Sequence, residues 1–310
     1  MQVVERLEVI KGPSSLIYGT SGISYGGLLN IVTKKPFKKK FFDAGLTFGS
    51  YNLQRFTGDI NIPFNDDNTM LFRLNVVAHS EGSFQDYGFK RSYLLAPSFY
   101  YKINNNTEFF FDAELNNSKF SSPTWFIGVG ALNVNQIDEI KVDYFKSYVS
   151  RDLDFEPTQL NNYYGRLNYS VSEDWKLSAN VALADINLNG SNMVPLFLND
   201  SLMVRRLFDY NGQYNTLNLH PFITGDFLIG NFRNRMIFGI DYKWAQIHLS
   251  RFYNLNIDTI NYTQDNFPLL NLNQIRMNYS TSFIEKATAN NVALYVSDFF
   301  SFNEQLNLMI

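Results

Sequence analysis

The chain has 310 residues, of which 45% are hydrophobic and 16% aromatic, so it can form one large domain or two ordinary ones around a sizeable core. Only 18% of the residues are charged and the net charge is −3, which gives no electrostatic basis for binding nucleic acid. The absence of cysteine excludes disulfides, thiolate chemistry and zinc sites with cysteine ligands. No apolar run is long enough for a membrane helix, and the first residues do not resemble a signal peptide.

The opening segment, residues 1–36, differs from everything that follows it. Residues 4–11 and 28–33 alternate as short strands do, and the stretch between them is rich in glycine. Glycine permits positive φ and close approach of the backbone, so two short strands joined by a tightly folded glycine loop are expected. A phosphate-binding loop is rejected, because the GxxxxGK[ST] pattern is absent and no helix follows.

From residue 41 onward the dominant period is two. Residues 71–79, for example, place Phe72 and Leu74 on one face and Arg73 and Asn75 on the other. This alternation is typical of strands with one apolar face. The expected strands are 41–49, 54–62, 71–79, 92–102, 107–116, 162–171, 177–183, 215–229, 235–245 and 288–302, with an eleventh that begins at Leu306.

The connections between these strands alternate in length. Short polar breaks are expected at 63–68, 102–106, 172–174, 230–234 and 302–305, and mostly long connections at 81–91, 117–161, 189–214 and 252–287. Outer-membrane barrels have short periplasmic turns at one end and long extracellular loops at the other, with an apolar outer face and aromatic girdles. The pattern therefore favours an antiparallel transmembrane barrel wall over a soluble β-sandwich.

Two stretches, "ERLEVIKGPSSLIYG" (5–19) and "GGLLNIVTKKP" (26–36), resemble the C-terminal part of the plug domain of TonB-dependent outer-membrane receptors. Residues 48–61 and 293–310 resemble barrel strands of the same family, and Tyr25 departs from it where many relatives have proline. The residues that carry the plug motif are Glu5, Arg6, Glu8, Gly12, Pro13, Tyr18, Gly19, Gly26, Gly27 and Asn30.

The resemblance implies an all-β fold with residues 1–36 as the end of a plug and 37–310 as the N-terminal half of the barrel. Such a wall has about half of the 22 strands of the family and is open in this chain. Lys34, Lys35 and residues 38–40 would form a basic hinge between plug and wall. Residues 1–36 should lie against the concave, polar face of the sheet.

Residues 12–15 (Gly-Pro-Ser-Ser) and 72–115 are more similar to receptors for iron–siderophore complexes than to glycan importers. The resemblance implies a receptor in the outer membrane of a Gram-negative-type bacterium, embedded in the lipid bilayer. It would import ferric siderophores with energy from the TonB complex, whose contact segment lies upstream of the usual plug. Iron is expected only inside the bound siderophore, with no cofactor and no enzymatic activity. The alternatives are an importer of glycans, peptides or cobalamin on the same scaffold, and a β-protein without a transport role, such as an adhesin.

Candidate ligand contacts lie in the long connection 117–161, which is rich in aromatic residues. We expect Trp125, Phe126, Tyr144 and Arg151 to contact a chelate, although aromatic residues at strand exits are more often part of a girdle. The three histidines, His79, His220 and His248, sit on separate strands, and the carboxylates Glu108, Asp112 and Glu114 share one face that suits a charged lumen lining. No catalytic or metal site converges in the sequence.

Overall fold

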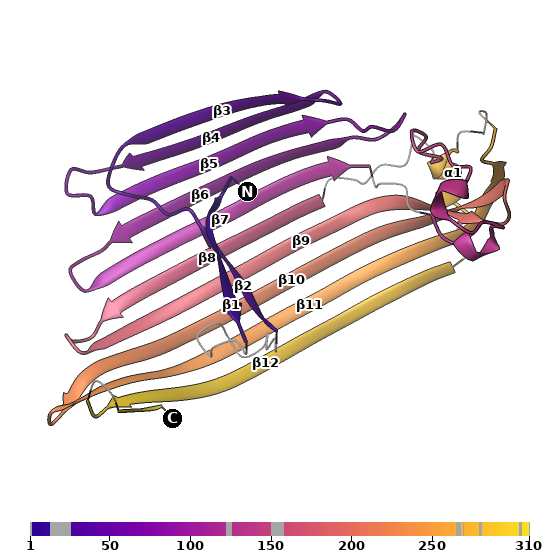
Figure 1. Cartoon of the computed structure of the whole chain (residues 1–310). Helices are drawn as coiled ribbons and strands as arrows, with labels where there is room; N and C mark the ends of the chain where they lie inside the picture. The colour runs from indigo at the N-terminus through magenta and orange to yellow at the C-terminus, as the bar shows by residue number, and fades with distance from the viewer. Residues whose placement is uncertain are drawn as a thin grey trace.

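The computed structural model describes residues 2–12, 26–121, 126–149, 158–264, 268, 270–278, 281–303 and 306–309. The described residues form a two-stranded sheet, β1-β2, and an eleven-stranded antiparallel sheet in which β3 to β13 follow one another in chain order (Figure 1). We call the first sheet the N-terminal ribbon and the second the wall. The expected all-β fold, with ten wall strands and the start of an eleventh, is confirmed. None of the helices in the described part has the length and apolar character that crossing a membrane requires.

The ribbon consists of β1 (Val4–Lys11) and β2 (Gly27–Thr33), and the wall consists of β3 (Phe41–Gly49), β4 (Leu53–Pro63), β5 (Met70–Glu81), β6 (Lys90–Lys102), β7 (Thr107–Phe120), β8 (Thr158–Ser170), β9 (Trp175–Phe197), β10 (Leu202–Ile229), β11 (Phe232–Asn261), β12 (Thr281–Ser301) and β13 (Asn307–Met309). The short helices are η2 (Val129–Ala131), η3 (Ile137–Glu139) and α1 (Leu272–Arg276).

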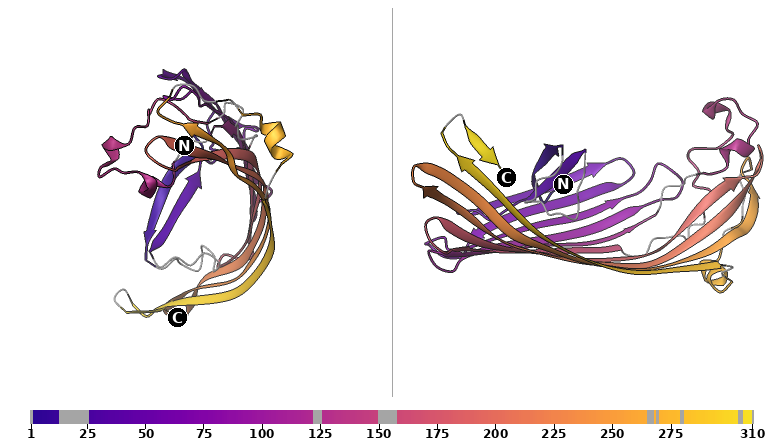
Figure 2. Two further views of the ribbon diagram at one scale, coloured as in Figure 1. Left: turned by 90° about the vertical axis from the view of Figure 1, so that its right-hand side faces the viewer. Right: turned by 90° about the horizontal axis from the view of Figure 1, so that it is seen from below.

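The ribbon lies in the hollow of the curved wall, as expected (Figure 2). Its two strands pair antiparallel, with Leu7 opposite Ile31 and Glu8 opposite Asn30. Gly27, where β2 begins, has φ +127°, and a Cβ on it would lie 2.3 Å from the carbonyl oxygen of Ile10. A glycine is therefore required at this position, where the two strands approach each other. Three other residues of the plug motif, Pro13, Tyr18 and Gly19, lie outside the described residues.

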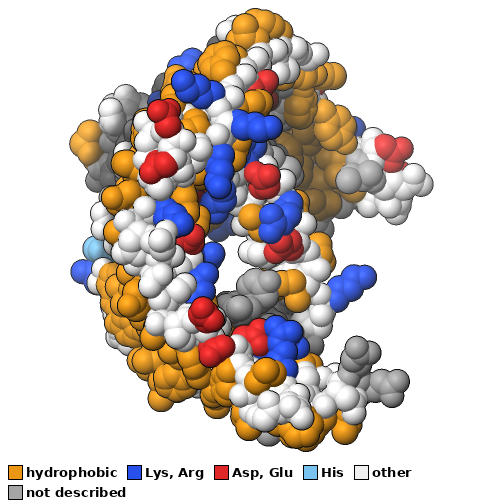
Figure 3. Space-filling view, turned by 90° about the vertical axis from the view of Figure 1, so that its left-hand side faces the viewer, with side chains coloured by type: hydrophobic (Ala, Val, Ile, Leu, Met, Phe, Trp, Pro, Cys, Tyr) orange, Lys and Arg blue, Asp and Glu red, His pale blue; other side chains and the backbone are white. Residues whose placement is uncertain are grey.

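The two faces of the wall differ in polarity. Hydrophobic side chains such as Leu46, Val292 and Leu294 are exposed on the outer, convex face. Charged side chains line the hollow (Figure 3). This is the arrangement of an outer-membrane barrel, in which the apolar band faces lipid and the interior is polar.

Aromatic side chains gather near the short-turn end of the wall. The ring centroids of Phe64 and Phe72 are 5.8 Å apart, and those of Phe232 and Phe300 are 5.7 Å apart. Phe300 is also 4.8 Å from Phe302. Their position at one end of the strands is that of an aromatic girdle.

The expected long connection at 189–214 was wrong. β9 and β10 continue through this stretch as one hairpin, with Met193 opposite Leu207 and a turn at 198–201. Met193, Val194 and Phe197 are all buried, so residues on both faces of β9 are covered here. Because both faces are covered, the stretch lacks the polar–apolar alternation by which the other strands were found. β11 likewise extends to Asn261, beyond its expected end at 245.

Candidate functional site

Residues 126–149 form an arm at the long-loop end of the wall. The arm starts against β9, where the Ile127 amide donates to the Pro195 carbonyl at 3.0 Å and the Phe197 amide donates to the Ile127 carbonyl at 3.0 Å. The ring of Phe126 stacks on that of Phe197 at 5.4 Å and meets that of Tyr148 edge-on at 5.9 Å. The arm is thus fixed at its start by backbone pairing and at both ends by aromatic packing.

An apolar cluster beneath the arm joins it to the extended ends of β9, β10 and β11. Its buried members are Leu132, Tyr148, Phe197, Met203, Ile260 and Tyr262. Burial raises the pKa of the Tyr262 phenol, and the carboxylate of Asp200 contributes to the shift. Tyr262 is therefore neutral at physiological pH and is held as a packing residue.

The far end of the arm carries an exposed aromatic pair, Tyr144 and Phe145, with 61% and 69% of their surface exposed. The loop between β5 and β6 supports them: the Asp86 amide donates to the Phe145 carbonyl at 2.7 Å, and the Asp86 carboxylate accepts from the Ser147 amide at 2.9 Å. Phe84, in the same loop, is 54% exposed. We call Phe84, Tyr144 and Phe145 the rim aromatics.

The structure separates the residues proposed as ligand contacts. Phe126 is partly buried and packs against the apolar cluster, whereas Tyr144 is exposed near the end of the arm. Trp125 and Arg151 lie outside the described residues. Sequence reasoning missed Phe84, although a lone aromatic residue in the polar stretch 81–86 was a signal that could have identified it.

The carboxylates on the inner face of β7 have separate partners. Asp112 forms an ion pair with Lys35 and a hydrogen bond with Ser98, while Glu114 accepts a 3.1 Å hydrogen bond from Asn162. They line the hollow, as expected, and do not converge on one point. Within the described ranges, no group of three or more histidine or acidic side chains could hold a metal ion.

His220 and Tyr295 lie together on the inner face, with 2.6 Å between the His220 Nε2 and the Tyr295 hydroxyl. Gly239 makes room for this contact, because a Cβ there would lie 2.3 Å from the Tyr295 hydroxyl oxygen. His79 and His248 lie on β5 and β11, so the three histidines are on separate strands, as expected. The contact joins β10 to β12 across β11 on the inner face.

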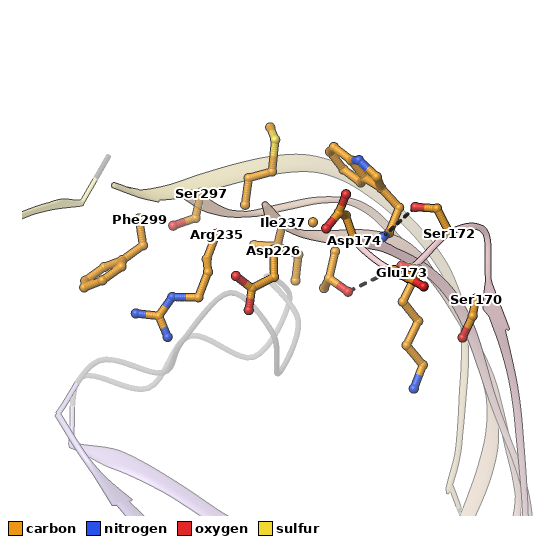
Figure 4. A pocket seen from close by; sticks show the side chains of 14 residues that line it. Ser170, Ser172, Glu173, Asp174, Asp226, Arg235, Ile237, Ser297 and Phe299 are labelled. Atoms are coloured by element: carbon orange, nitrogen blue, oxygen red, sulfur yellow. Dashed lines mark hydrogen bonds between the residues drawn. The ribbon is translucent and has the colours of Figure 1, made fainter. Parts of the chain in front are cut away.

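A cavity of about 530 Å³ lies at the short-turn end of β8 to β12 (Figure 4). Its ionisable lining residues are Glu173, Asp174, Lys176, Asp226 and Arg235. The guanidinium of Arg235 lies 4.6 Å from the centre of the Phe299 ring, and both side chains project from the same side of the sheet. Acidic and basic groups are mixed here, so the cavity has no strong preference for an ion of either sign.

No family model matches the chain. Among curated proteins it is similar to the metal-pseudopaline receptor CntO of Pseudomonas aeruginosa, with 26% identity over 249 residues, which is 77% of this chain and 33% of the receptor. It is also similar to the ferrichrome outer membrane transporter/phage receptor of Escherichia coli, with 32% identity over 109 residues, or 35% of this chain and 14% of that protein. The chain spans about a third of the length of the first of these relatives.

Solved receptor structures share the fold over nearly the whole chain. The ferripyoverdine receptor of Pseudomonas aeruginosa has a TM-score of 0.78 at 17% identity and covers 100% of this chain, which spans 41% of that receptor. The closed form of the ferric-catecholate import receptor Fiu of Escherichia coli has a TM-score of 0.78 at 16% identity and covers 97% of this chain, which spans 44% of it. The chain is thus similar in sequence to outer-membrane receptors for metal chelates, and it shares the fold of siderophore receptors over nearly its whole length.

Proposed function

We propose that this chain forms the end of the plug and the N-terminal half of the barrel of a receptor that imports ferric siderophores or similar metal chelates. Residues 1–36 would belong to the plug and residues 37–310 to the barrel. The TonB complex would supply the energy through a plug segment upstream of β1. The observation that carries this proposal is the match of almost the whole chain, ribbon and wall together, to siderophore receptor structures.

The rim aromatics are the residues that we propose meet the chelate first. Phe84, Tyr144 and Phe145 expose apolar ring faces at the end of the wall that corresponds to the extracellular side of a barrel. The backbones of Tyr144 and Phe145 are held by hydrogen bonds to the loop between β5 and β6, so little backbone entropy is lost when a ligand binds there. The relatives include receptors for ferrichrome, ferrioxamine, catecholate siderophores and metal-pseudopaline, all of which are organic chelators or their metal complexes.

The test is uptake of radioactive iron by cells with and without the gene. Hydroxamate, catecholate and carboxylate chelates would be supplied separately, with cobalamin and a maltooligosaccharide as control nutrients and a strain without TonB as a second control. We expect the deletion to abolish TonB-dependent uptake of one chelate class and to leave both control nutrients unaffected.

Two other outcomes would contradict the proposal. Loss of cobalamin or oligosaccharide uptake with unchanged iron uptake would assign the chain to a different importer on the same scaffold. Unchanged uptake of every nutrient, together with loss of surface attachment, would favour an adhesin.

A further inference from the structure

The segment that follows the ribbon is bound to the inner face of the wall by two lysines. The Lys34 Nζ lies 2.8 Å from a carboxylate oxygen of Asp59 on β4 and 3.5 Å from the side-chain oxygen of Asn75 on β5. Lys35 forms an ion pair with Asp112 on β7. Two successive residues therefore contact three wall strands, so Lys34 and Lys35 of the expected basic hinge have defined partners.

Asn61 on β4 holds the backbone of the same segment. Its side chain accepts from the Phe37 amide at 3.0 Å and donates to the carbonyls of Phe37 at 2.7 Å and Lys39 at 2.6 Å. Asn61 is fully buried in this position. One amide side chain thus satisfies both backbone groups of Phe37, as a neighbouring strand would.

Asp59 is the central group of this attachment. Its two carboxylate oxygens accept from the guanidinium of Arg73 on β5 at 2.9 and 2.8 Å, and one of them also contacts Lys34. Arg73 in turn donates to the Lys35 carbonyl at 2.9 Å and lies 5.1 Å from the centre of the Phe37 ring. Removing the Asp59 charge would leave two cations at a nearly buried position without their shared anion, which is strongly unfavourable.

The ribbon itself is held less firmly. In the part of the chain that the structure describes, neither β1 nor β2 packs extensively against a wall strand, and the ion pair from β1 to the wall is the 3.8 Å contact between Glu5 and Arg73. The Lys34 amide donates to the Val3 carbonyl at 2.9 Å, and Val4 pairs with Thr33. The chain therefore enters β1 at the same end of the ribbon at which β2 joins the wall-bound segment.

We propose that a fixed attachment, which we call the latch, holds the plug to the wall, and that the ribbon opens from its Val4–Thr33 end while the latch stays closed. The latch consists of Lys34, Lys35, Phe37, Asp59, Asn61, Arg73 and Asp112. A pulling force that is applied to the chain before β1 would break the hydrogen bonds between β1 and β2 one after another. The contacts of the latch are spread over β4, β5 and β7 and share the load. This inference rests on the proposed function only for the source of the pull.

The latch can be tested without transport, by the labelling rate of a single cysteine. The chain has no cysteine of its own, so Pro36→Cys, between Lys35 and Phe37, reports local opening of the latch itself. Outer membranes that contain the receptor would be treated with a thiol reagent. The test variant is Asp59→Asn, and the matched control is Asp43→Asn, which removes an exposed carboxylate directly opposite Asp59 on β3.

We expect Asp59→Asn to raise the labelling rate about tenfold or more through more frequent local opening, and Asp43→Asn to leave it unchanged. Lys34→Gln removes only the plug side of the ion pair and should raise the rate by a smaller factor. If Asp59→Asn does not accumulate in the membrane, Lys34→Gln provides the test instead, because this variant keeps the Asp59–Arg73 ion pair of the wall. Equal labelling rates in all variants would overturn the latch.

The opening of the ribbon is tested in uptake assays with a reversible disulfide. Leu7 and Ile31 are directly opposite each other, and opposed residues in antiparallel strands have Cα separations of about 4.5–5.5 Å, within the range of a disulfide. Leu7→Cys with Ile31→Cys should abolish chelate uptake when oxidised and restore it when reduced, with each single variant as control. Full uptake by the oxidised protein would show that transport does not require the ribbon to open, and would overturn this part of the proposal. If the wild type imports no chelate, the proposed function is wrong. The labelling rates still test the latch in that case, because they do not depend on transport.

Discussion

Single side chains affect the stability of the pairing between β1 and β2, and Glu8 contributes to it through its charged carboxylate. Its carboxylate accepts a 2.7 Å hydrogen bond from Asn30 on the opposite strand and another from Arg6 at 2.7 Å, and these contacts lower the pKa of Glu8. A lowered pKa stabilises the paired form above the usual pKa of glutamate, and this contribution is lost as pH falls through the lowered value.

Glu8→Gln should therefore reduce the pH dependence of ribbon pairing. In the wild type, hydrogen exchange of residues 4–11, corrected for the intrinsic exchange rate, should accelerate below about pH 4. In the variant the acceleration over the same range should be smaller. Identical acid profiles for the two proteins would show that Glu8 does not contribute to ribbon stability.

Gly27 controls the same pairing through its backbone. Gly27→Ala would place a Cβ 2.3 Å from the Ile10 carbonyl at a φ of +127°. The strain should cost about 1–3 kcal/mol and open the start of β2, raising hydrogen exchange at Ile10 and Lys11. Gly26→Ala is the matched control, because a Cβ at that position meets no atom within 4 Å. Equal exchange in the two variants would contradict the steric argument.

At the scale of elements, the arm of residues 126–149 carries both a buried aromatic residue and the exposed ones that we propose contact the ligand. Tyr148 is 1% exposed, and its hydroxyl accepts from the Asp143 amide at 2.8 Å, whereas Tyr144 and Phe145 are mostly exposed. Replacing a buried aromatic residue by alanine typically costs about 3–5 kcal/mol, so Tyr148→Ala should lower the amount of folded receptor.

Tyr144→Ala and Phe145→Ala should instead leave receptor abundance unchanged and raise the chelate concentration at half-maximal uptake several-fold. Each exposed ring contributes about 0.5–1.5 kcal/mol when it packs against another aromatic group. Phe64→Ala removes another exposed aromatic residue, at the short β4–β5 turn at the opposite end of the wall, and serves as the control. An unchanged half-saturation concentration in both arm variants would remove them from the binding surface.

Polar–apolar alternation in the sequence identifies the strands that have one polar face. It does not identify the parts of strands in which both faces are buried. Strands β3 to β8 were found because their outer residues are apolar and their inner residues polar, as in the pair Phe72 and Arg73. The upper part of β9 was missed, since Met193 and Val194 are both buried. The latch could not be predicted in detail, because alternation places Asp59 on the inner face but does not specify which lysine of the ribbon segment lies opposite it.

At the scale of the whole molecule, the wall is an open sheet with two edges. In the described residues β3 pairs only with β4, and β12 pairs with β13 over residues 299–301 alone. Unpaired edges recruit further strands, and the outer face exposes side chains such as Leu46 and Leu294. The 310-residue chain, produced by itself without detergent, should therefore aggregate. Recovery of a folded, monodisperse monomer in sedimentation velocity without detergent would contradict this expectation.

The strands of the wall are very unequal in length, and in the proposed receptor the height of the rim would therefore vary along the wall. At about 3.3 Å per residue, the 11 residues of β4 extend roughly 36 Å, while the 28 residues of β10 extend roughly 90 Å. A hydrocarbon core is about 30 Å thick, so β4 ends near the membrane surface and β10 stands far above it. In the proposed receptor, the rim formed by β3 to β6 would therefore be low and the rim formed by β9 to β11 high. The rim aromatics, supported by the loop between β5 and β6, would stand above the low part.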